Sequence, residues 1–288
     1  KENKKNFFHL RELIKSTSSL VPTTTWFAFS KLCEKIKLKK YKVILTGTGG
    51  DEMFAGYYIH QLHYLFSIKY SKNFNKKYEE WRKKLAPLLR NNFLKNYDLY
   101  EKKINKKNDL MFYDFLTLKK YFKKYKLIKN KGYKANSYYF KKSLLNDLFN
   151  YSLPSQIAAI DNISMFHGLE SRAPFLSKDL YEKSFSYPND YLINDGFGKY
   201  ILRKSLKKVV DDEILDNRDK VGFFININNL FNFRDRKILK LLYSNKYINS
   251  LIDKRKLKLL LLKENKTNQE CHFIFSIMNI IIFIDEYE

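Results

Sequence analysis

The chain has 288 residues, of which 44% are hydrophobic, so it can bury the core of one large domain or two ordinary ones. Its formal net charge is +25 at pH 7, which makes polyanionic partners worth considering. The lysines are spread along the chain rather than gathered in a stripe, and this favours a solvated basic surface with no nucleic-acid partner. Only two cysteines, Cys33 and Cys271, are present, which excludes a disulfide framework and a thiolate metal cluster and fits a cytoplasmic protein.

The chain begins KENKKNFFHL, without methionine and without the charged, apolar and small-residue pattern of a signal peptide. We therefore expect it to be a piece of a longer polypeptide.

A helix followed by a strand is predicted next. Between Pro22 and Leu38, apolar side chains at Phe29, Leu32, Cys33 and Ile36 recur at helical spacing. The run YKVIL, residues 41–45, is typical of a strand buried on both faces of a parallel sheet. A glycine loop and a second helix from position 51 follow, so we predict an α/β fold in which ligands bind beyond the carboxyl ends of the strands.

The loop TGTGGDE, residues 46–52, could hold phosphate. Gly47, Gly49 and Gly50 allow a ligand to approach the backbone closely, and a helix beginning near Asp51 would point free N–H groups at an anion. A carboxylate at that place repels phosphate unless a divalent cation lies between them, so Asp51 is a candidate ligand for Mg²⁺. Alternatively, the loop is only a turn in which Asp51 caps the helix and Glu52 favours its dipole.

The rest of the chain divides by composition. We expect residues 1–60 to be the remainder of a nucleotide-binding α/β core and residues 61–150 to be lysine- and aromatic-rich helices of the same domain. Residues 151–230, with most of the remaining prolines and glycines, are expected to complete the site. Residues 231–288 form a helical tail, in which the twelve-residue apolar run 273–284 is too short to span a membrane and is expected to be buried.

Three histidines could suggest metal sites. In DNISMFHGLESRAPFL, residues 161–176, helical spacing would place Ile163, His167 and Glu170 on one face, although a packed helix with a paired Arg172 explains this segment equally well. His60 and His63 could share a metal ion, but no third ligand has the right spacing.

The segment GFGKYILRKSLKK, residues 196–208, predicts a helix with a buried stripe of Leu202, Leu206 and Val209. Lys199, Arg203 and Lys207 would form a basic column on another face. Like charges at this spacing oppose the helix unless an anion compensates them, although a solvated face is the ordinary interpretation.

Three motifs of the chain, in this order, resemble the synthetase domain of glutamine-hydrolysing asparagine synthetases. They are VILTGTGGDEMFAGYY, DNISMFHGLESRAPFLSKDLYEKSFSYPNDYLINDGFGKYILRKSL and RDKVGFF. The resemblance covers residues 20–58 and 153–224. It implies an adenine nucleotide alpha hydrolase-like (Rossmann-like) parallel sheet flanked by helices, and a reaction in which aspartate is adenylated by ATP with Mg²⁺ and then amidated by glutamine-derived ammonia.

The resemblance also assigns roles to residues. Thr46 and Gly47 match nucleotide contacts, with Gly49 and Gly50 beside them in the loop, and Asp51 matches the carboxylate that binds Mg²⁺ and pyrophosphate. Lys199 matches the lysine that stabilises charge in the adenylation step. Thr48 stands where standard members carry a glutamate that handles a proton, so either another group does this work or the product is not asparagine.

Two further parts of the family are absent from the 288 residues: the Ser-Gly-Gly-x-Asp-Ser pyrophosphate loop and the glutaminase domain with its N-terminal cysteine. Both belong upstream in family order, so we expect an upstream glutaminase domain in the same polypeptide, and a homodimer is possible. The chain alone is predicted to bind ATP weakly and to make no product. The alternatives are a paralogue that amidates a sugar acid or peptide, and a non-catalytic split partner that binds a polyanion.

Overall fold

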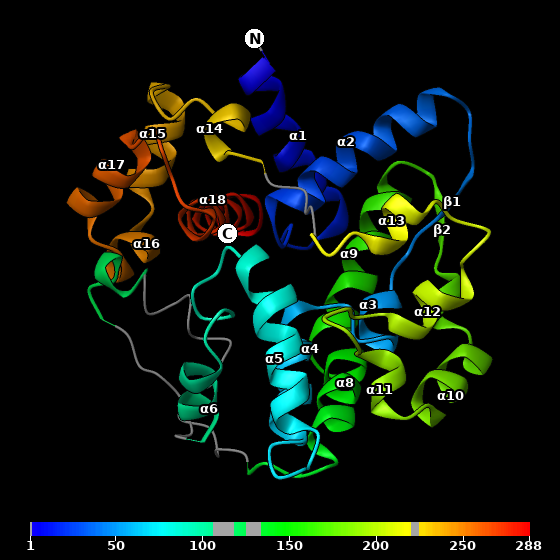
Figure 1. Ribbon diagram of the computed structural model, residues 1–288. Helices are drawn as coiled ribbons and strands as arrows, with labels where there is room; N and C mark the ends of the chain where they lie inside the picture. The colour runs from blue at the N-terminus through cyan, green and yellow to red at the C-terminus, as the bar shows by residue number, and fades with distance from the viewer. Residues whose placement is uncertain (1, 106–117, 125–133, 220–224) are drawn as a thin grey trace.

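The computed structural model describes residues 2–105, 118–124, 134–219 and 225–288. Helices dominate these ranges (Figure 1), and two short strands form a sheet. The α-helices are α1 (Glu2–Thr17), α2 (Thr24–Leu38), α3 (Gly50–Met53), α4 (Tyr58–Ser67), α5 (Phe74–Lys84), α6 (Tyr97–Asn105), α8 (Tyr139–Phe149), α9 (Ser152–Phe166), α10 (Lys178–Ser186), α11 (Asn189–Leu192), α12 (Tyr200–Ser205), α13 (Asp212–Asp216), α14 (Ile227–Leu230), α15 (Arg236–Ser244), α16 (Lys246–Leu251), α17 (Lys254–Leu262) and α18 (Asn268–Tyr287). Short 3₁₀ turns lie at Ala86–Leu88, Lys119–Tyr121 and Pro174–Leu176.

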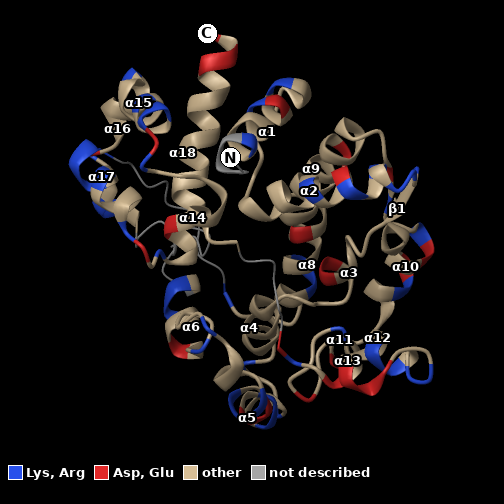
Figure 2. Ribbon diagram, turned by 90° about the horizontal axis from the view of Figure 1, so that it is seen from above, with Lys and Arg blue, Asp and Glu red and all other residues tan. Residues whose placement is uncertain are grey.

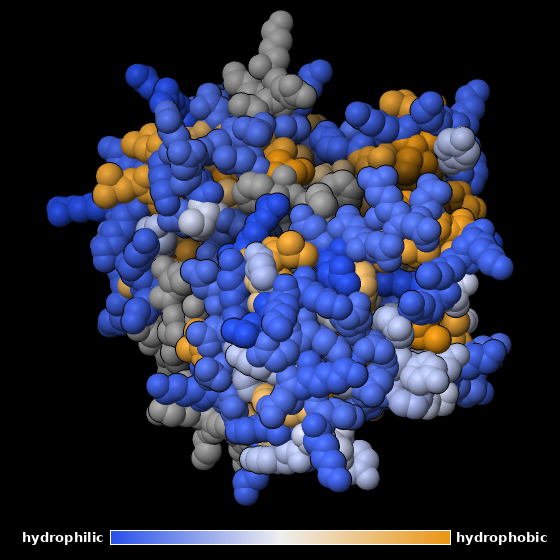
Figure 3. All heavy atoms as spheres, viewed as in Figure 1, coloured by the Kyte–Doolittle hydropathy of each residue, from blue (hydrophilic) through white to orange (hydrophobic). Residues whose placement is uncertain are grey.

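The sheet pairs β1 (Val43–Leu45) with β2 (Glu170–Arg172) in parallel, with Val43 opposite Glu170. The chain is thus a helix-rich α/β structure with a small parallel sheet, and a wider Rossmann-like sheet stays a prediction. The expectation that this strand is buried on both faces is wrong, because Leu45 is 73% exposed. Among the described residues, β1 pairs with β2 along one edge and with no strand along the other. Figure 3 shows apolar surface on the side of the molecule where β1 lies.

The predicted helix after Pro22 is confirmed as α2, but its buried face differs from the expected stripe. Phe27, Ser30 and Cys33 are buried in α2, whereas Leu32 is half exposed. The helix carries apolar side chains on more than one face, so helical spacing did not decide which face turns inward.

The largest core is built around α18, which contains the apolar run 273–284. Helices α1 and α14 to α17 surround α18 in Figure 1, and the ribbon of α18 in Figure 2 is mostly tan, with acidic residues at its C-terminal end. Thr267 and Glu270 start it with a capping box. The prediction of a buried C-terminal element is therefore confirmed, and no helix in the described ranges is long and apolar enough to cross a membrane.

The lysine- and aromatic-rich segment forms a second core in its described part. Its buried side chains include Phe66, Trp81, Tyr97 and Tyr100, contributed by α4, α5 and α6. Residues 106–117 and 125–133 of the expected helical segment lie outside the described residues. Where the structure describes it, aromatic side chains packed inside lysine-bearing helices confirm the expectation.

Candidate active site

The glycine loop ends in a single helical turn. Gly49 has a positive φ of 89° and precedes α3, which is only four residues long, so Gly49 rather than Asp51 occupies the cap position. The helix predicted from position 51 is present only as the single turn α3, because Ala55 adopts a left-handed backbone with φ 57° and the next helix begins at Tyr58. A four-residue helix offers little dipole, so the prediction of an anion held by its N-terminus loses its basis.

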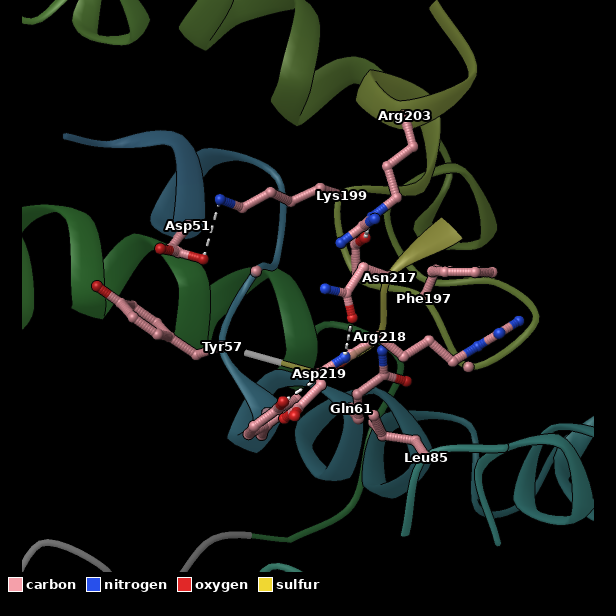
Figure 4. A pocket seen from close by; sticks show the side chains of 14 residues that line it. Asp51, Tyr57, Gln61, Leu85, Phe197, Lys199, Arg203, Asn217, Arg218 and Asp219 are labelled. Carbon is pink, nitrogen blue, oxygen red and sulfur yellow. Dashed lines mark hydrogen bonds and ion pairs between the residues drawn. The ribbon is translucent and has the colours of Figure 1, made fainter. Parts of the chain in front are cut away.

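The turn is joined to the second signature region by Lys199. The Lys199 amide donates to the Phe54 carbonyl at 2.8 Å, and its ammonium lies 3.1 Å from the Asp51 carboxylate (Figure 4). Lys199 adopts a left-handed conformation, with φ 55° and ψ 31°, at the cap position of α12. Asp51 and Lys199, which lie in different motifs of the sequence, are thus in direct contact in the folded chain.

Two glycines allow this approach. A Cβ atom at Gly56 would lie 1.9 Å from the Asp51 carboxylate and 2.3 Å from Cε of Lys199, and a Cβ atom at Gly198 would lie 2.3 Å from the Ala55 carbonyl oxygen. All three separations are far shorter than van der Waals contact. The sequence analysis assigned no role to Gly56 or Gly198, although both lie in the quoted motifs, within FAGYY and GFGK.

The basic helix around Lys199 differs from the prediction. It ends at Ser205, so Lys199, Arg203 and Lys207 form no continuous column, and the expected buried stripe is wrong since Val209 is 77% exposed. Arg203 instead donates through Nη1 to the carbonyl oxygens of Ile214 and Leu215, at 3.3 and 2.5 Å. These hydrogen bonds fix the guanidinium against α13. The ordinary interpretation of a solvated basic face therefore does not hold for Arg203.

Asp51 and Lys199 open into a pocket of about 140 Å³ (Figure 4). Its other charged side chains are Arg203, Arg218 and Asp219. The Arg218 guanidinium stacks 3.7 Å from the centre of the Phe197 ring. The pocket is lined by Asp51, Gly56, Tyr57, Tyr58, Gln61, Leu85, Gly196, Phe197, Gly198, Lys199, Arg203, Asn217, Arg218 and Asp219.

Two of the lining residues, Arg218 and Asp219, come from the RDKVGFF motif, whose remaining residues 220–224 lie outside the described part. No role was predicted for Phe197, Arg218 or Asp219 individually. Their signal was their place inside the quoted motifs.

Glu52, the neighbour of Asp51, is almost fully buried. Its Oε1 accepts hydrogen bonds from the Tyr57 hydroxyl at 2.6 Å, Ser152 at 3.0 Å and Gln156 at 2.8 Å. Burial, and then the bond to this carboxylate, raise the pKa of the Tyr57 phenol. Glu52 therefore ties the turn to α9, whereas the sequence suggested only a dipole interaction.

Thr46 and Thr48 face a different pocket. The Thr46 hydroxyl donates to the Thr48 hydroxyl at 3.0 Å, and the Thr46 amide donates to the Arg172 carbonyl oxygen at 2.8 Å, next to the end of β2. Both threonines line a pocket of about 450 Å³ that shares no lining residue with the pocket at Asp51. The predicted site residues thus line two separate pockets that border one loop.

The loop glycines differ in their surroundings. A Cβ atom at Gly47 would meet no atom within 4 Å, so this backbone is open to a ligand. Gly49 and Gly50 instead pack on Leu176 and Phe175, and a Cβ atom at Gly49 would overlap Leu176 at 2.2 Å. The nucleotide contacts predicted for these glycines stay predictions, and the open space favours Gly47.

The histidines are held by other groups. His60 pairs through Nε2 with Asp147 at 2.9 Å, His63 bonds the Tyr100 hydroxyl at 2.6 Å, and His167 bonds Ser30 at 2.8 Å. Among the described residues no three His, Cys, Asp or Glu side chains are placed to hold a metal ion. His60 and His63 thus each have a side-chain partner within the chain.

The prediction that Ile163, His167 and Glu170 share one helical face is wrong. Helix α9 ends at Phe166 and Glu170 begins β2, so Ile163 is buried while Glu170 is exposed. Arg172 does pair with Glu170, at 2.7 Å, but along the strand. The predicted pairing of Arg172 is confirmed, and its helical setting is not.

Asp51 fits Mg²⁺ in one specific manner. Magnesium is commonly held by one or two carboxylates together with substrate phosphates and water. The half-buried Asp51 carboxylate and the exposed Asp219 beside three cationic side chains match that donor set, because the cations would donate hydrogen bonds to the phosphates. The residues present thus suit a metal brought with a polyphosphate better than a metal held by protein alone.

Comparison with known proteins gives a consistent result. A family model described as "Asparagine synthase" matches residues 3–282. A relative from Bacillus subtilis (strain 168), named "Asparagine synthetase [glutamine-hydrolyzing] 1", is 36% identical over 67 residues, which is 23% of this chain. The match spans 10% of the length of that relative.

Proposed function

The chain belongs to the asparagine synthase family, and from this premise we propose that it supplies the carboxylate-activating part of an ATP-dependent amidating enzyme. A carboxylate oxygen of the acceptor forms a bond to the α-phosphorus of ATP, and the bond from that phosphorus to the bridging oxygen breaks, releasing pyrophosphate. Ammonia then attacks the acyl carbon, loses a proton, and displaces AMP. Aspartate is the first acceptor to test, with glutamine as the source of ammonia through an upstream domain of the same polypeptide.

The single observation that carries this proposal is the ion pair of Lys199 with Asp51 at 3.1 Å in a pocket rich in cations. The side chains are 31% and 24% exposed, so both remain accessible to a ligand from the pocket. Asp51 would hold Mg²⁺, which when bound neutralises phosphate charge. Lys199 would then donate hydrogen bonds to the phosphate oxygens on which negative charge increases as pyrophosphate departs.

The test is pyrophosphate release by the native protein that carries this chain, with ATP and a panel of carboxylic acids. We expect release to depend on both ATP and acid, and Lys199→Gln to lower kcat by about 10² to 10³, the typical effect of removing one preorganised donor. The matched control is Lys178→Gln, since Lys178 is an exposed lysine on α10. Full activity of Lys199→Gln would refute the role of Lys199, and no acid-dependent release with any acceptor would refute the proposed function.

A second candidate is amidation of a carboxylate other than aspartate, such as a sugar acid or peptide. The observation that favours it is Thr48, which lies in a pocket lined mainly by apolar side chains. A threonine hydroxyl is no base at neutral pH, so Thr48 cannot repeat the proton-handling role expected of a glutamate. Thr48→Glu should increase the activity with aspartate relative to other acids if this position controls the acceptor.

A further inference from the structure

The pocket at Thr46 and Thr48 has a volume of about 450 Å³ and lies at the carboxyl ends of both strands. Its walls come from α8, α9, β2 and the turn after β2. The lining residues are Thr46, Thr48, Leu148, Phe149, Pro154, Ile157, Ala158, Ile160, Asp161, Ser171, Ala173 and Leu176.

This pocket is separate from the one at Asp51 and Lys199, so an acceptor could occupy it while pyrophosphate occupies the other. In phosphoryl and adenylyl transfer the attacking and leaving oxygens are roughly in line through the phosphorus. If pyrophosphate leaves toward Asp51 and Lys199, the attacking carboxylate must come from the opposite side. Thr46 and Thr48 precede Asp51 in the same loop and line a pocket that shares no residue with the one at Asp51, so this second pocket is the candidate for the acceptor.

The charges of the lining decide what kind of acceptor fits. Eight of the residues are alanine, proline or larger apolar residues, and Asp161 is the single ionisable one, so among the described lining residues there is no Lys, Arg or His. Aspartate would bring a second carboxylate that finds no cation among these residues, and only its ammonium group could pair with Asp161. A second charge without a partner is costly to desolvate, whereas an apolar group gains by leaving water.

The polar groups of the pocket are few and partly occupied. The Thr48 hydroxyl already accepts a hydrogen bond from the Thr46 hydroxyl. The threonine side chain is also smaller than a glutamate side chain and carries no charge. The sugar hydroxyls of a sugar acid would therefore face Leu148, Phe149 and Ile157 without enough partners. The lining discriminates against both highly polar acceptor types.

We propose that this pocket binds the body of the acceptor, and that the acceptor is a monocarboxylic acid with an apolar body rather than aspartate or a sugar acid. The inference rests on the proposed function, since it names the substrate class of the same adenylation. The carboxylate would lie at the loop, and the apolar body would lie between α8 and α9.

Binding can be measured directly with the full chain. The probes are 4-phenylbutanoate, aspartate and glucuronate, each titrated separately and followed by ligand-observed NMR. We expect 4-phenylbutanoate to bind at least tenfold more tightly than either polar acid. Equal or tighter binding of aspartate or glucuronate would overturn the proposal.

Two variants locate the binding. Ala158→Trp puts a bulky ring at an exposed position of α9 in the pocket lining, and should weaken binding of 4-phenylbutanoate at least tenfold. Met165→Trp is the matched control, because Met165 is exposed on the same helix but outside the lining. Thermal unfolding identifies a variant that fails to fold. Should Ala158→Trp be unstable, Ile157→Arg replaces it, and here the ratio of aspartate to 4-phenylbutanoate affinity should rise at least tenfold.

Pyrophosphate release by the native protein distinguishes a failure of the proposed acceptor class from a failure of the proposed function. Release with 4-phenylbutanoate and not with aspartate supports both. Release with aspartate or glucuronate alone leaves the proposed function standing and overturns the acceptor class. Tight binding of 4-phenylbutanoate without release, when other acids are also inactive, overturns the acceptor role together with the proposed function.

Discussion

Asp51 and Glu52 are adjacent in the sequence and chemically alike, yet they belong to different regions of the molecule. Asp51 faces the pocket of Figure 4 and pairs with Lys199, a cation from a distant segment. Glu52 is instead buried and accepts hydrogen bonds from Tyr57, Ser152 and Gln156. Asp51 thus remains accessible from the pocket, whereas Glu52 links the turn to α9.

The pocket side should be sensitive in activity and tolerant in stability. Asp51→Ala removes the expected metal ligand and the partner of Lys199, so pyrophosphate release should fall by about 10² to 10³. The free energy of unfolding should change by less than about 1 kcal/mol, because a partly exposed ion pair contributes little. Steady-state kinetics and urea unfolding on the same preparation check both statements. Loss of the fold rather than of activity would remove the distinction between the two carboxylates.

The buried side should show the reverse. Glu52→Ala leaves the Tyr57 hydroxyl and the Gln156 amide without their acceptor, and we expect a loss of about 3 kcal/mol in the free energy of unfolding. Urea unfolding measures this, with Asp51→Ala as the matched control in the next position. A loss below about 1 kcal/mol would show that the network around Glu52 is not what holds the turn.

The stability of the chain should also depend on pH through the buried His63. Burial, and to a lesser extent the nearby His60, lower the pKa of His63 to about 3 in the folded chain, from 6.5 in the unfolded chain. Between these values the unfolded state binds more protons, so stability falls as pH falls. By pH 5 the loss from His63 should reach about 2 kcal/mol.

His63→Phe should reduce this acid-dependent loss, although it also removes the bond to the Tyr100 hydroxyl. Unfolding in urea at pH 7 and pH 5 measures the slope for both proteins. Part of the slope should remain, because burial also lowers the pKa of His9, to about 4. An unchanged slope would show that His63 does not titrate as its burial indicates.

Local chemistry in the sequence determined several features. The β-branched run at residues 43–45 forms a strand, the apolar run 273–284 forms a buried helix, and Cys33 and Cys271 remain free in packed elements. These follow from side-chain shape and hydrophobic spacing within a few residues of the chain. The motifs also placed Asp51 and Lys199 in one predicted site.

Only the tertiary structure decided how the predicted site residues are arranged. Lys199 reaches Asp51 because Gly56 and Gly198 permit two distant backbones to touch, and the left-handed backbone of Lys199 is supported by its bond to Phe54. Periodicity instead predicted a basic helical column there. Contacts between distant segments depend on the packing of the whole chain, so no local pattern could show that one loop turns Asp51 and Thr48 toward two different pockets.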